Sequence, residues 1–118
     1  MKLPNRRLSM TRTVKWGEKS VHVSAGYNPE TGLLCEVFAY GPKSGSEASA
    51  LLTEICIERS KAIQNGTSPD YFAQKCIRNG DGSATSISGV VADALAMECA
   101  DWNREIARGA ENTQPGLK

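Results

Sequence analysis

The sequence is poor in the residues from which metal sites and redox pairs are built. It has one histidine, His22, and no two of its four cysteines stand close enough for a CxxC pair. Zinc sites usually take their ligands in close pairs, so this spacing argues against one. We predict no metal, no cofactor and no disulfide, and we expect the cysteines in the core as small hydrophobic residues. They are Cys35, Cys56, Cys76 and Cys99.

Long apolar runs are also lacking. None approaches the roughly 20 residues that span a bilayer, and the basic N-terminal residues are not followed by the apolar stretch of a secretory signal. We therefore expect a cytoplasmic protein that does not enter a membrane. Its 14 lysines and arginines and 13 acidic residues give a net charge of +1, which is too small to draw the whole molecule to nucleic acid or to a membrane surface.

A chain of 118 residues is one domain by size, and it is long enough for a single core without disulfides or metals. Hydrophobic residues make up 40% of it and charged residues 23%, an ordinary globular mixture. We place the domain at residues 11–109. An extended basic arm is expected at residues 1–10 and a flexible tail at residues 110–118, where apolar residues are few.

The basic residues near the N-terminus are unevenly placed. Those that precede Trp16, with no acid among them, are Lys2, Arg6, Arg7, Arg12 and Lys15. A basic terminal arm of this kind is more often exposed to solvent without a binding role. Arg6, Arg7 and Arg12 are nevertheless candidate contacts to a phosphate or to nucleic acid.

Alternating apolar residues predict the strands, which are 11–16, 19–27 and 33–40. In the first hairpin the alternation places Val14 opposite Val21. In the second it places Val23 opposite Val37, so that the small apolar side chains share one face. The result is a three-stranded antiparallel meander with one face that needs a cover.

Apolar residues at helical spacing then predict three helices as that cover. The first begins after a Ser44 or Ser46 cap and ends at Asn65-Gly66. The second is short, at about 69–77, and the third runs over about 87–107 until Gly109 closes it. The predicted fold class is α+β, a three-stranded antiparallel meander covered on one face by about three helices.

Two loops rich in glycine and hydroxyl groups each precede a predicted helix. The first turn of a helix carries unpaired N–H groups and a partial positive charge, so two such starts lying together can hold a phosphate or another anion. The simpler alternative is that the serines cap their own helices, and neither loop has the Walker order of glycine and lysine. The candidate anion-binding residues are Lys43, Ser44, Gly45, Ser46, Gly82, Ser83, Thr85 and Ser86.

No set of nucleophile, base and acid can be assembled from the sequence with a geometry that the pattern supports. His22 is more readily a surface strand residue than a base. Glu36 is more readily a cross-strand polar partner than a catalytic acid. We therefore predict no catalytic residue.

Four short stretches occur in a recognisable order. They are Leu3-Pro4-Asn5-Arg6-Arg7, Thr11-Arg12-Thr13-Val14, Glu36-Val37-Phe38-Ala39 and Lys43-Ser44-Gly45-Ser46-Glu47. In this order, and followed by the second loop, they resemble the TSCPD domain family. That domain stands at the C-terminal end of adenosylcobalamin-dependent ribonucleotide reductases and also occurs as short stand-alone proteins.

The chain departs from the motif that gives the family its name. Where the family has Thr-Ser-Cys-Pro-Asp, the nearest run here is Thr85-Ser86-Ile87-Ser88-Gly89. A thiol or metal role attached to the family cysteine therefore cannot be carried onto Ile87. A full reductase also needs a large barrel with a radical-bearing cysteine, which 118 residues cannot hold.

The resemblance implies a non-catalytic binding or regulatory module that acts through a partner protein, such as a reductase, with nucleotide or phosphate at the two loops. Alone it is not expected to be catalytic. Two alternatives stay open: an accessory subunit of a split ribonucleoside-diphosphate reductase, and a nucleic-acid-binding protein that uses the basic arm. We also expect a homodimer, because a small three-stranded sheet leaves an edge or an apolar face to cover.

Overall fold

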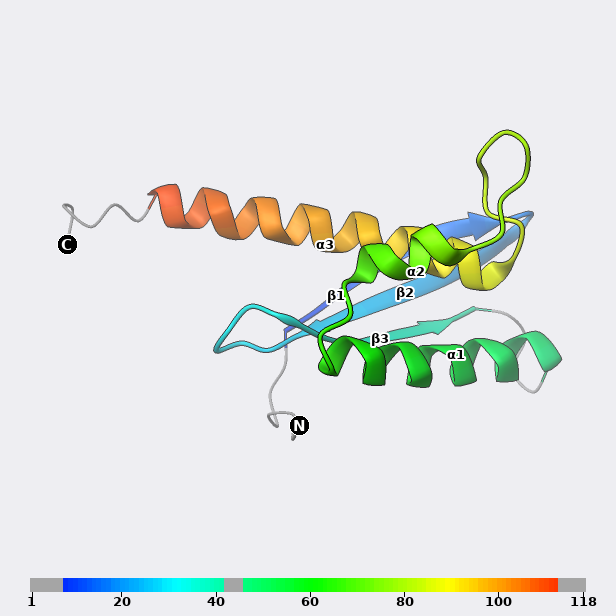
Figure 1. The fold of residues 1–118 in the computed structure, drawn as a ribbon, viewed down its shortest axis with the longest axis horizontal. Coiled ribbons are helices and arrows are strands. Elements are labelled where there is room, and N and C mark those ends of the chain that lie inside the picture. Colours follow the sequence, from blue (N-terminus) through cyan, green and yellow to red (C-terminus); the bar gives the residue numbers. More distant parts are fainter. Residues whose placement is uncertain (1–7, 42–45, 113–118) are drawn as a thin grey trace.

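Three strands and three helices make up the described part of the chain. The computed structural model describes residues 8–41 and 46–112, and the side chains of these ranges through residue 108. In chain order the elements are β1 (Leu8–Trp16), β2 (Lys19–Tyr27), β3 (Leu34–Tyr40), α1 (Glu47–Gln64), α2 (Pro69–Lys75) and α3 (Ile87–Asn112). The predicted α+β fold class is confirmed (Figure 1).

The sheet is an antiparallel meander with the strand order β1-β2-β3. β1 begins at Leu8 rather than at the predicted Thr11, so the end of the predicted arm pairs with β2. The predicted pairing of Val14 with Val21 is confirmed. Gly17 supplies the positive φ, 62°, that the tight turn between these strands requires.

The second hairpin has a different register from the predicted one. Val23 pairs with Ala39 and not with Val37, and the ladder shifts between Gly26 and Tyr27. The connection is therefore longer than the predicted turn. Moving a strand by two residues keeps every side chain on the same face. The apolar side chains therefore lie on the predicted face of the sheet, although the residue pairs between β2 and β3 differ from the predicted ones.

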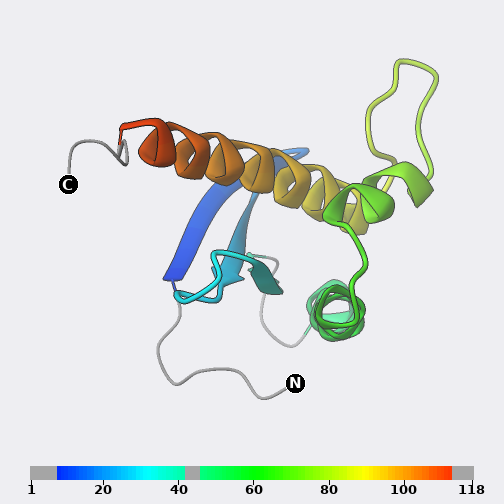
Figure 2. The same ribbon diagram turned by 60° about the vertical axis from the view of Figure 1, so that its left-hand side comes forward.

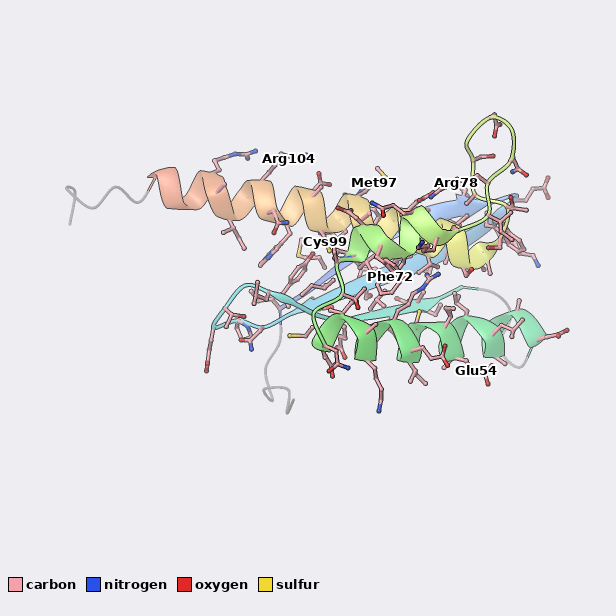
Figure 3. The ribbon with its side chains drawn as sticks, in the orientation of Figure 1. Glu54, Phe72, Arg78, Met97, Cys99 and Arg104 are labelled. Atoms are coloured by element: carbon pink, nitrogen blue, oxygen red, sulfur yellow. The ribbon has the colours of Figure 1, made fainter. Side chains whose placement is uncertain are left out.

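Apolar side chains of this sheet face pack against the helices. α1 lies along β3, whereas α3 contacts mainly β1 and β2 (Figures 1 and 2). α2 packs on α3 and reaches the core through Phe72 (Figure 3). The strand residues of the core include Val21, Val23, Ala25, Tyr27, Val37 and Ala39. The helix residues include Leu52, Cys56, Ile63, Val91, Leu95 and Cys99.

Helix α1 also closes the outer edge of β3. Ser60 Oγ accepts a hydrogen bond from the N–H of Val37 and donates one to the carbonyl of Val37, both at 3.0 Å. Gln64 Nε2 donates to the carbonyl of Cys35 at 3.1 Å. Side chains of α1 thus take the place of a neighbouring strand. The opposite edge of the sheet is β1.

Two helices end elsewhere than predicted. α2 ends at Lys75, two residues early, because the backbone of Cys76 is extended, with φ −75° and ψ 149°. α3 continues to Asn112 through Gly109, the predicted closing residue. One glycine costs a helix only about 1 kcal/mol relative to alanine, so it need not end the helix. The rest of the predicted tail lies outside the described residues.

Trp102 fastens the middle of α3 to the sheet. Its ring stacks on that of Tyr27, with the centroids 4.3 Å apart, and its Nε1 donates a hydrogen bond to the carbonyl of Gly32 at 2.9 Å. This contact fixes how far α3 lies over the sheet, because both the apolar ring and its polar N–H are engaged.

Candidate functional site

The first predicted loop is described only in part. Lys43, Ser44 and Gly45 lie outside the described residues. Ser46 has extended backbone before α1, and its Oγ accepts a hydrogen bond from the N–H of Ser49 at 3.1 Å. The hydroxyl oxygen of Ser46 therefore caps its own helix, as the simpler interpretation predicts.

The second predicted loop is held by hydrogen bonds among its own residues. Ser83 Oγ donates to Asp81 Oδ1 at 2.6 Å, and Thr85 Oγ1 donates to Asn79 Oδ1 at 3.3 Å. The bonds from Ser83 also lower the pKa of the Asp81 carboxyl group. Gly82 has a φ of 90°, which the turn requires. Three of the predicted site residues thus lie in a loop that projects from the helices (Figure 1).

Arg78 anchors this loop to α2 and α3 (Figure 3). Its guanidinium donates two hydrogen bonds to the carboxylate of Asp93, at 2.7 and 2.6 Å, and one to the carbonyl of Ala73 at 2.7 Å. A bidentate pair of this kind fixes orientation as well as distance. Arg78 therefore fixes the position of the loop between α2 and α3 relative to both helices.

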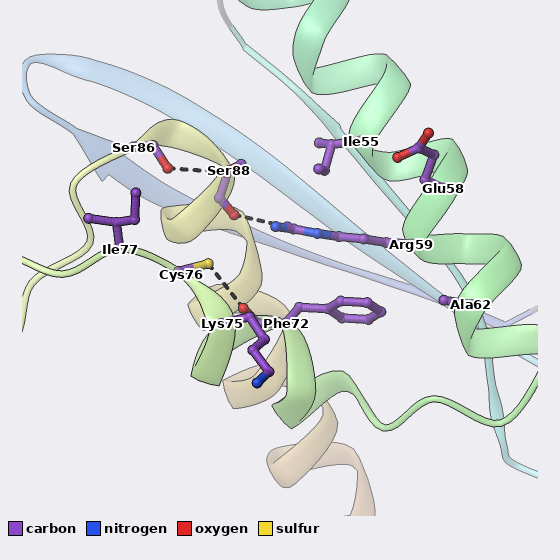
Figure 4. Close-up of a pocket in the computed structure, with 10 residues that line it drawn as sticks. All are labelled: Ile55, Glu58, Arg59, Ala62, Phe72, Lys75, Cys76, Ile77, Ser86 and Ser88. Atoms are coloured by element: carbon purple, nitrogen blue, oxygen red, sulfur yellow. Dashed lines mark hydrogen bonds between the residues drawn. The ribbon is translucent and has the colours of Figure 1, made fainter.

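A pocket of about 470 Å³ lies between the middle of α1, α2 and the start of α3 (Figure 4). Of the predicted anion-binding residues, Ser86 lines it. Ser46 lies about 20 Å before Arg59 along α1, at 1.5 Å per residue, so α1 contributes its middle and not its start. The apolar side chains that line the pocket include Ile55, Phe72 and Ile77, and the polar ones include Arg59, Ser86 and Ser88.

Ser86 caps α3 at one wall of this pocket. Its Oγ accepts a hydrogen bond from the N–H of Gly89 at 3.2 Å, and its carbonyl accepts one from Val90 at 3.1 Å. The hydroxyl groups of Ser86 and Ser88 lie 3.1 Å apart. Two hydroxyl groups and the start of a long helix therefore share one wall.

Arg59 is the pocket residue that sequence reasoning missed. It is 7% exposed and shares the buried side of α1 with Leu52 and Cys56. Its Nη1 donates to the carbonyl of Ser88 at 2.9 Å, and its guanidinium carbon lies 5.4 Å from the centre of the Phe72 ring. The signal in the sequence is a charged residue at an apolar position of the helical repeat.

The cysteines are buried as predicted, except that Cys76 is only half-buried. Cys35, Cys56 and Cys99 are 1%, 2% and 6% exposed, whereas Cys76 lines the pocket. Burial raises the pKa of the Cys56 thiol to about 11, although the charge of Arg59 opposes the rise. Burial also raises the pKa of Cys99. These two thiols are protonated at neutral pH and are therefore poor nucleophiles.

The fold is expected to lose stability in alkali. Cys56 holds its proton more tightly in the folded state, because its pKa rises from 9.0 to about 11. The resulting stabilisation is complete below pH 9 and is lost as the pH rises through 11; at 1.4 kcal/mol per pKa unit it amounts to about 3 kcal/mol. Urea unfolding midpoints at mildly and strongly alkaline pH measure it. The Cys56→Ala variant should lose less stability than the wild type between the two pH values. An equal loss of stability in both proteins would contradict the assignment to Cys56.

Of the three arginines predicted to contact phosphate or nucleic acid, the structure describes Arg12. Arg6 and Arg7 lie outside the described residues. Arg12 Nε lies 3.5 Å from Glu98 Oε1, and its Nη2 pairs with Asp101. Because Glu98 is buried, Arg12 balances a carboxylate inside the fold, which leaves less of its charge for a nucleic acid.

The described residues offer neither a metal-binding cluster nor a membrane-spanning helix. No three of their His, Cys, Asp or Glu side chains gather where they could hold a metal ion. None of the described helices is both long and apolar enough to cross a bilayer. The pocket at the start of α3 is the candidate site because Arg59, Ser86 and Ser88 line it together.

The sequence profile of the TSCPD domain matches residues 1–99, most of the chain. This chain belongs to the TSCPD domain family. The TSCPD domain is associated with the C-terminal region of ribonucleotide reductases. No curated protein and no solved structure gives a significant match.

The run nearest to the family's name, Thr85 to Gly89, lies at the pocket. In this TSCPD domain, Ser86 and Ser88 line the pocket, whereas Ile87 packs against the hydrophobic core. Position 87 therefore supplies an apolar contact to the core and carries no thiol. The two hydroxyl groups on either side of it are what the run offers to a ligand.

Proposed function

We propose that this TSCPD-domain protein is a non-catalytic binding module that regulates a partner protein, with a ribonucleotide reductase as the candidate partner. Nucleotide or phosphate is its proposed ligand, because reductases of this class act on nucleotides. The observation that carries the proposal is the pocket at the start of α3, which Ser86 and Ser88 line together with Arg59.

The chemistry of the thiols supports binding rather than turnover. The buried Cys56 and Cys99 have raised pKa values, and a protonated thiol neither attacks a substrate nor exchanges readily with a disulfide. Position 87 carries an isoleucine side chain. A module with these features supports catalysis by contacting another protein.

An accessory subunit of a split reductase is the second candidate, and the family's association with the reductase C-terminal region favours it. The two candidates differ in one respect. A regulatory module changes how the reductase responds to nucleotides, whereas an accessory subunit is required for any turnover. The nucleic-acid alternative is weakened by the ion pairs that Arg12 makes within the fold.

A binding and activity assay with the adenosylcobalamin-dependent reductase of the same cell tests the proposal. We expect the chain to elute with the reductase in gel filtration, to reduce no ribonucleotide alone, and to change the nucleotide dependence of reductase activity. A reductase that turns over only after the chain is added would support the accessory subunit instead. Failure to form a complex at micromolar concentrations would contradict both candidates.

A further inference from the structure

The pocket between α1, α2 and the start of α3 contains a buried cation, Arg59, that pairs with no carboxylate of the described residues. Arg59 is 7% exposed, and no carboxylate among the described residues lies within 4.0 Å of its nitrogens. Buried charges in proteins are normally paired, because an unpaired charge is costly to remove from water. An arginine cannot avoid this cost by losing its proton, because the guanidinium group stays protonated in proteins.

Most of the hydrogen-bonding capacity of Arg59 is unused. A guanidinium has several N–H donors, and the single acceptor that it meets among the described residues is the carbonyl of Ser88. Every fully buried side-chain nitrogen and oxygen in the described part of the chain has a hydrogen-bond partner. The remaining nitrogens of Arg59 are therefore accessible, and the space next to this side chain is the pocket (Figure 4).

The start of α3 adds a second positive element to the same space. Ser86 Oγ accepts the hydrogen bond of Gly89, but the N–H groups of Ile87 and Ser88 have no acceptor within the helix. A helix start carries about half a positive charge. Placing it beside a buried guanidinium is unfavourable unless an anion lies close to both.

The other ionisable residues of the pocket do not neutralise Arg59. Glu58 is exposed and makes no ion pair with it. The ammonium group of Lys75 lies 5.5 Å from the centre of the Tyr71 ring, which does not line the pocket. The positive charge inside the pocket is therefore that of Arg59 and of the start of α3, beside an apolar wall.

We propose that this pocket binds a nucleotide, with its phosphate between Arg59 and the start of α3. The planar guanidinium matches two phosphate oxygens at once, and the hydroxyl groups of Ser86 and Ser88 supply further donors. The apolar wall, which includes Ile55 and Phe72, receives the base. The choice of a nucleotide rests on the proposed function, whereas the binding of phosphate rests on Arg59 and its surroundings.

Titration of the ¹⁵N-labelled chain alone with inorganic phosphate, ADP and adenosine tests this site by NMR. We expect saturable shifts of the amides of residues 87–89 with phosphate and with ADP, tighter binding of ADP, and much weaker binding of adenosine. An absence of saturable shifts with phosphate and with ADP would overturn the proposal. ADP that binds no more tightly than phosphate would overturn the nucleotide assignment.

Arg59→Met removes the charge while keeping much of the volume, so it is the decisive variant. We expect it to weaken phosphate and ADP binding at least about tenfold, and Arg59→Lys to weaken both less, because an ammonium group keeps the charge but lacks the planar fork. Arg104→Met is the matched control, because Arg104 is exposed and lies on the far half of α3 (Figure 3). Equal loss in this control would point to general charge effects and contradict the site.

The ligand-free stability of Arg59→Met gives a second readout. Replacing a buried unpaired charge with an apolar side chain is expected to leave the melting temperature unchanged or raise it. A clear fall would mean that Arg59 is structural and would contradict the proposal. These measurements use the chain without a partner, so their outcome is separate from that of the reductase experiment.

The wild-type chain offers a readout that needs no variant. Cys76 lines the pocket and is half-buried, whereas the other cysteines are buried. We expect ADP to slow the alkylation of Cys76 by iodoacetamide, measured by mass spectrometry of the modified peptide. An unchanged rate at saturating ADP would place the ligand elsewhere and overturn the assignment to this pocket.

Discussion

Replacing Gly41 with alanine is expected to destabilise the fold by roughly 3 kcal/mol or more. Gly41 has a φ of 147°, and an added Cβ would lie 2.3 Å from the carbonyl oxygen of Ser20 and 3.0 Å from Cα of Val21. These atoms belong to the backbone of β2, where Ser20 and Val21 pair with β1, so they cannot move aside without disturbing that pairing. Because small domains have about 5–15 kcal/mol of stability in total, the variant should unfold at clearly lower urea concentrations.

Gly80 provides the matched control for this substitution. Its φ is not positive, and a Cβ added there meets nothing within 4 Å. Gly80→Ala should therefore change the stability by no more than about 0.5 kcal/mol. Urea unfolding followed by circular dichroism compares the two variants. If Gly41→Ala unfolds at the same midpoint as the wild type, the close approach of Gly41 to β2 does not constrain the fold.

Replacing Arg12 with alanine is expected to destabilise the fold by about 3 kcal/mol. The guanidinium of Arg12 on β1 pairs with Glu98 and Asp101 on α3, and Glu98 is 7% exposed. Without Arg12 the carboxylate of Glu98 stays buried and loses its nearest positive charge. The expected result is a lower urea midpoint with a similar slope, since the folded structure itself is retained.

The double variant Arg12→Ala with Glu98→Gln separates this effect from a loss of packing. If Arg12→Ala lowers the stability because the Glu98 carboxylate is left buried without a partner, adding Glu98→Gln should recover at least about 1 kcal/mol of stability. A double variant whose loss equals the sum of the two single losses would show that Arg12 and Glu98 do not interact. The Arg12 side chain would then stabilise the fold through its apolar stem alone.

Most of the fold could be predicted because its signals are local. Alternation assigns side chains to sheet faces, and helical spacing and serine caps locate the helices. The register of the second hairpin could not be predicted in the same way. Alternation has a period of two, so pairing Val23 with Val37 or with Ala39 satisfies it equally, and the shift in the ladder beside Tyr27 decides between them.

The candidate site was less predictable because it is built from side chains far apart in the sequence. Ser86 was found through its position before a helix, which is a local signal. Arg59 was not, although it occupies an apolar position of α1 that it shares with Leu52 and Cys56. The role of Arg59 in the pocket depends on where α2 and the start of α3 lie relative to α1, and the sequence does not reveal that arrangement. The predicted role of Lys43 stays a prediction, since it lies outside the described residues.

The hydrogen bonds that Ser60 and Gln64 make to β3 limit how this sheet can be extended. With the β3 edge of the described sheet occupied by side chains of its own chain, the edge at which we expect a further strand to add is that of β1. If two copies paired there around a twofold axis, the free β1 edge of each copy would be covered by the other. We therefore expect association through strands to stop at a pair, because such a pair would leave neither edge of the described sheet open for growth into a fibre.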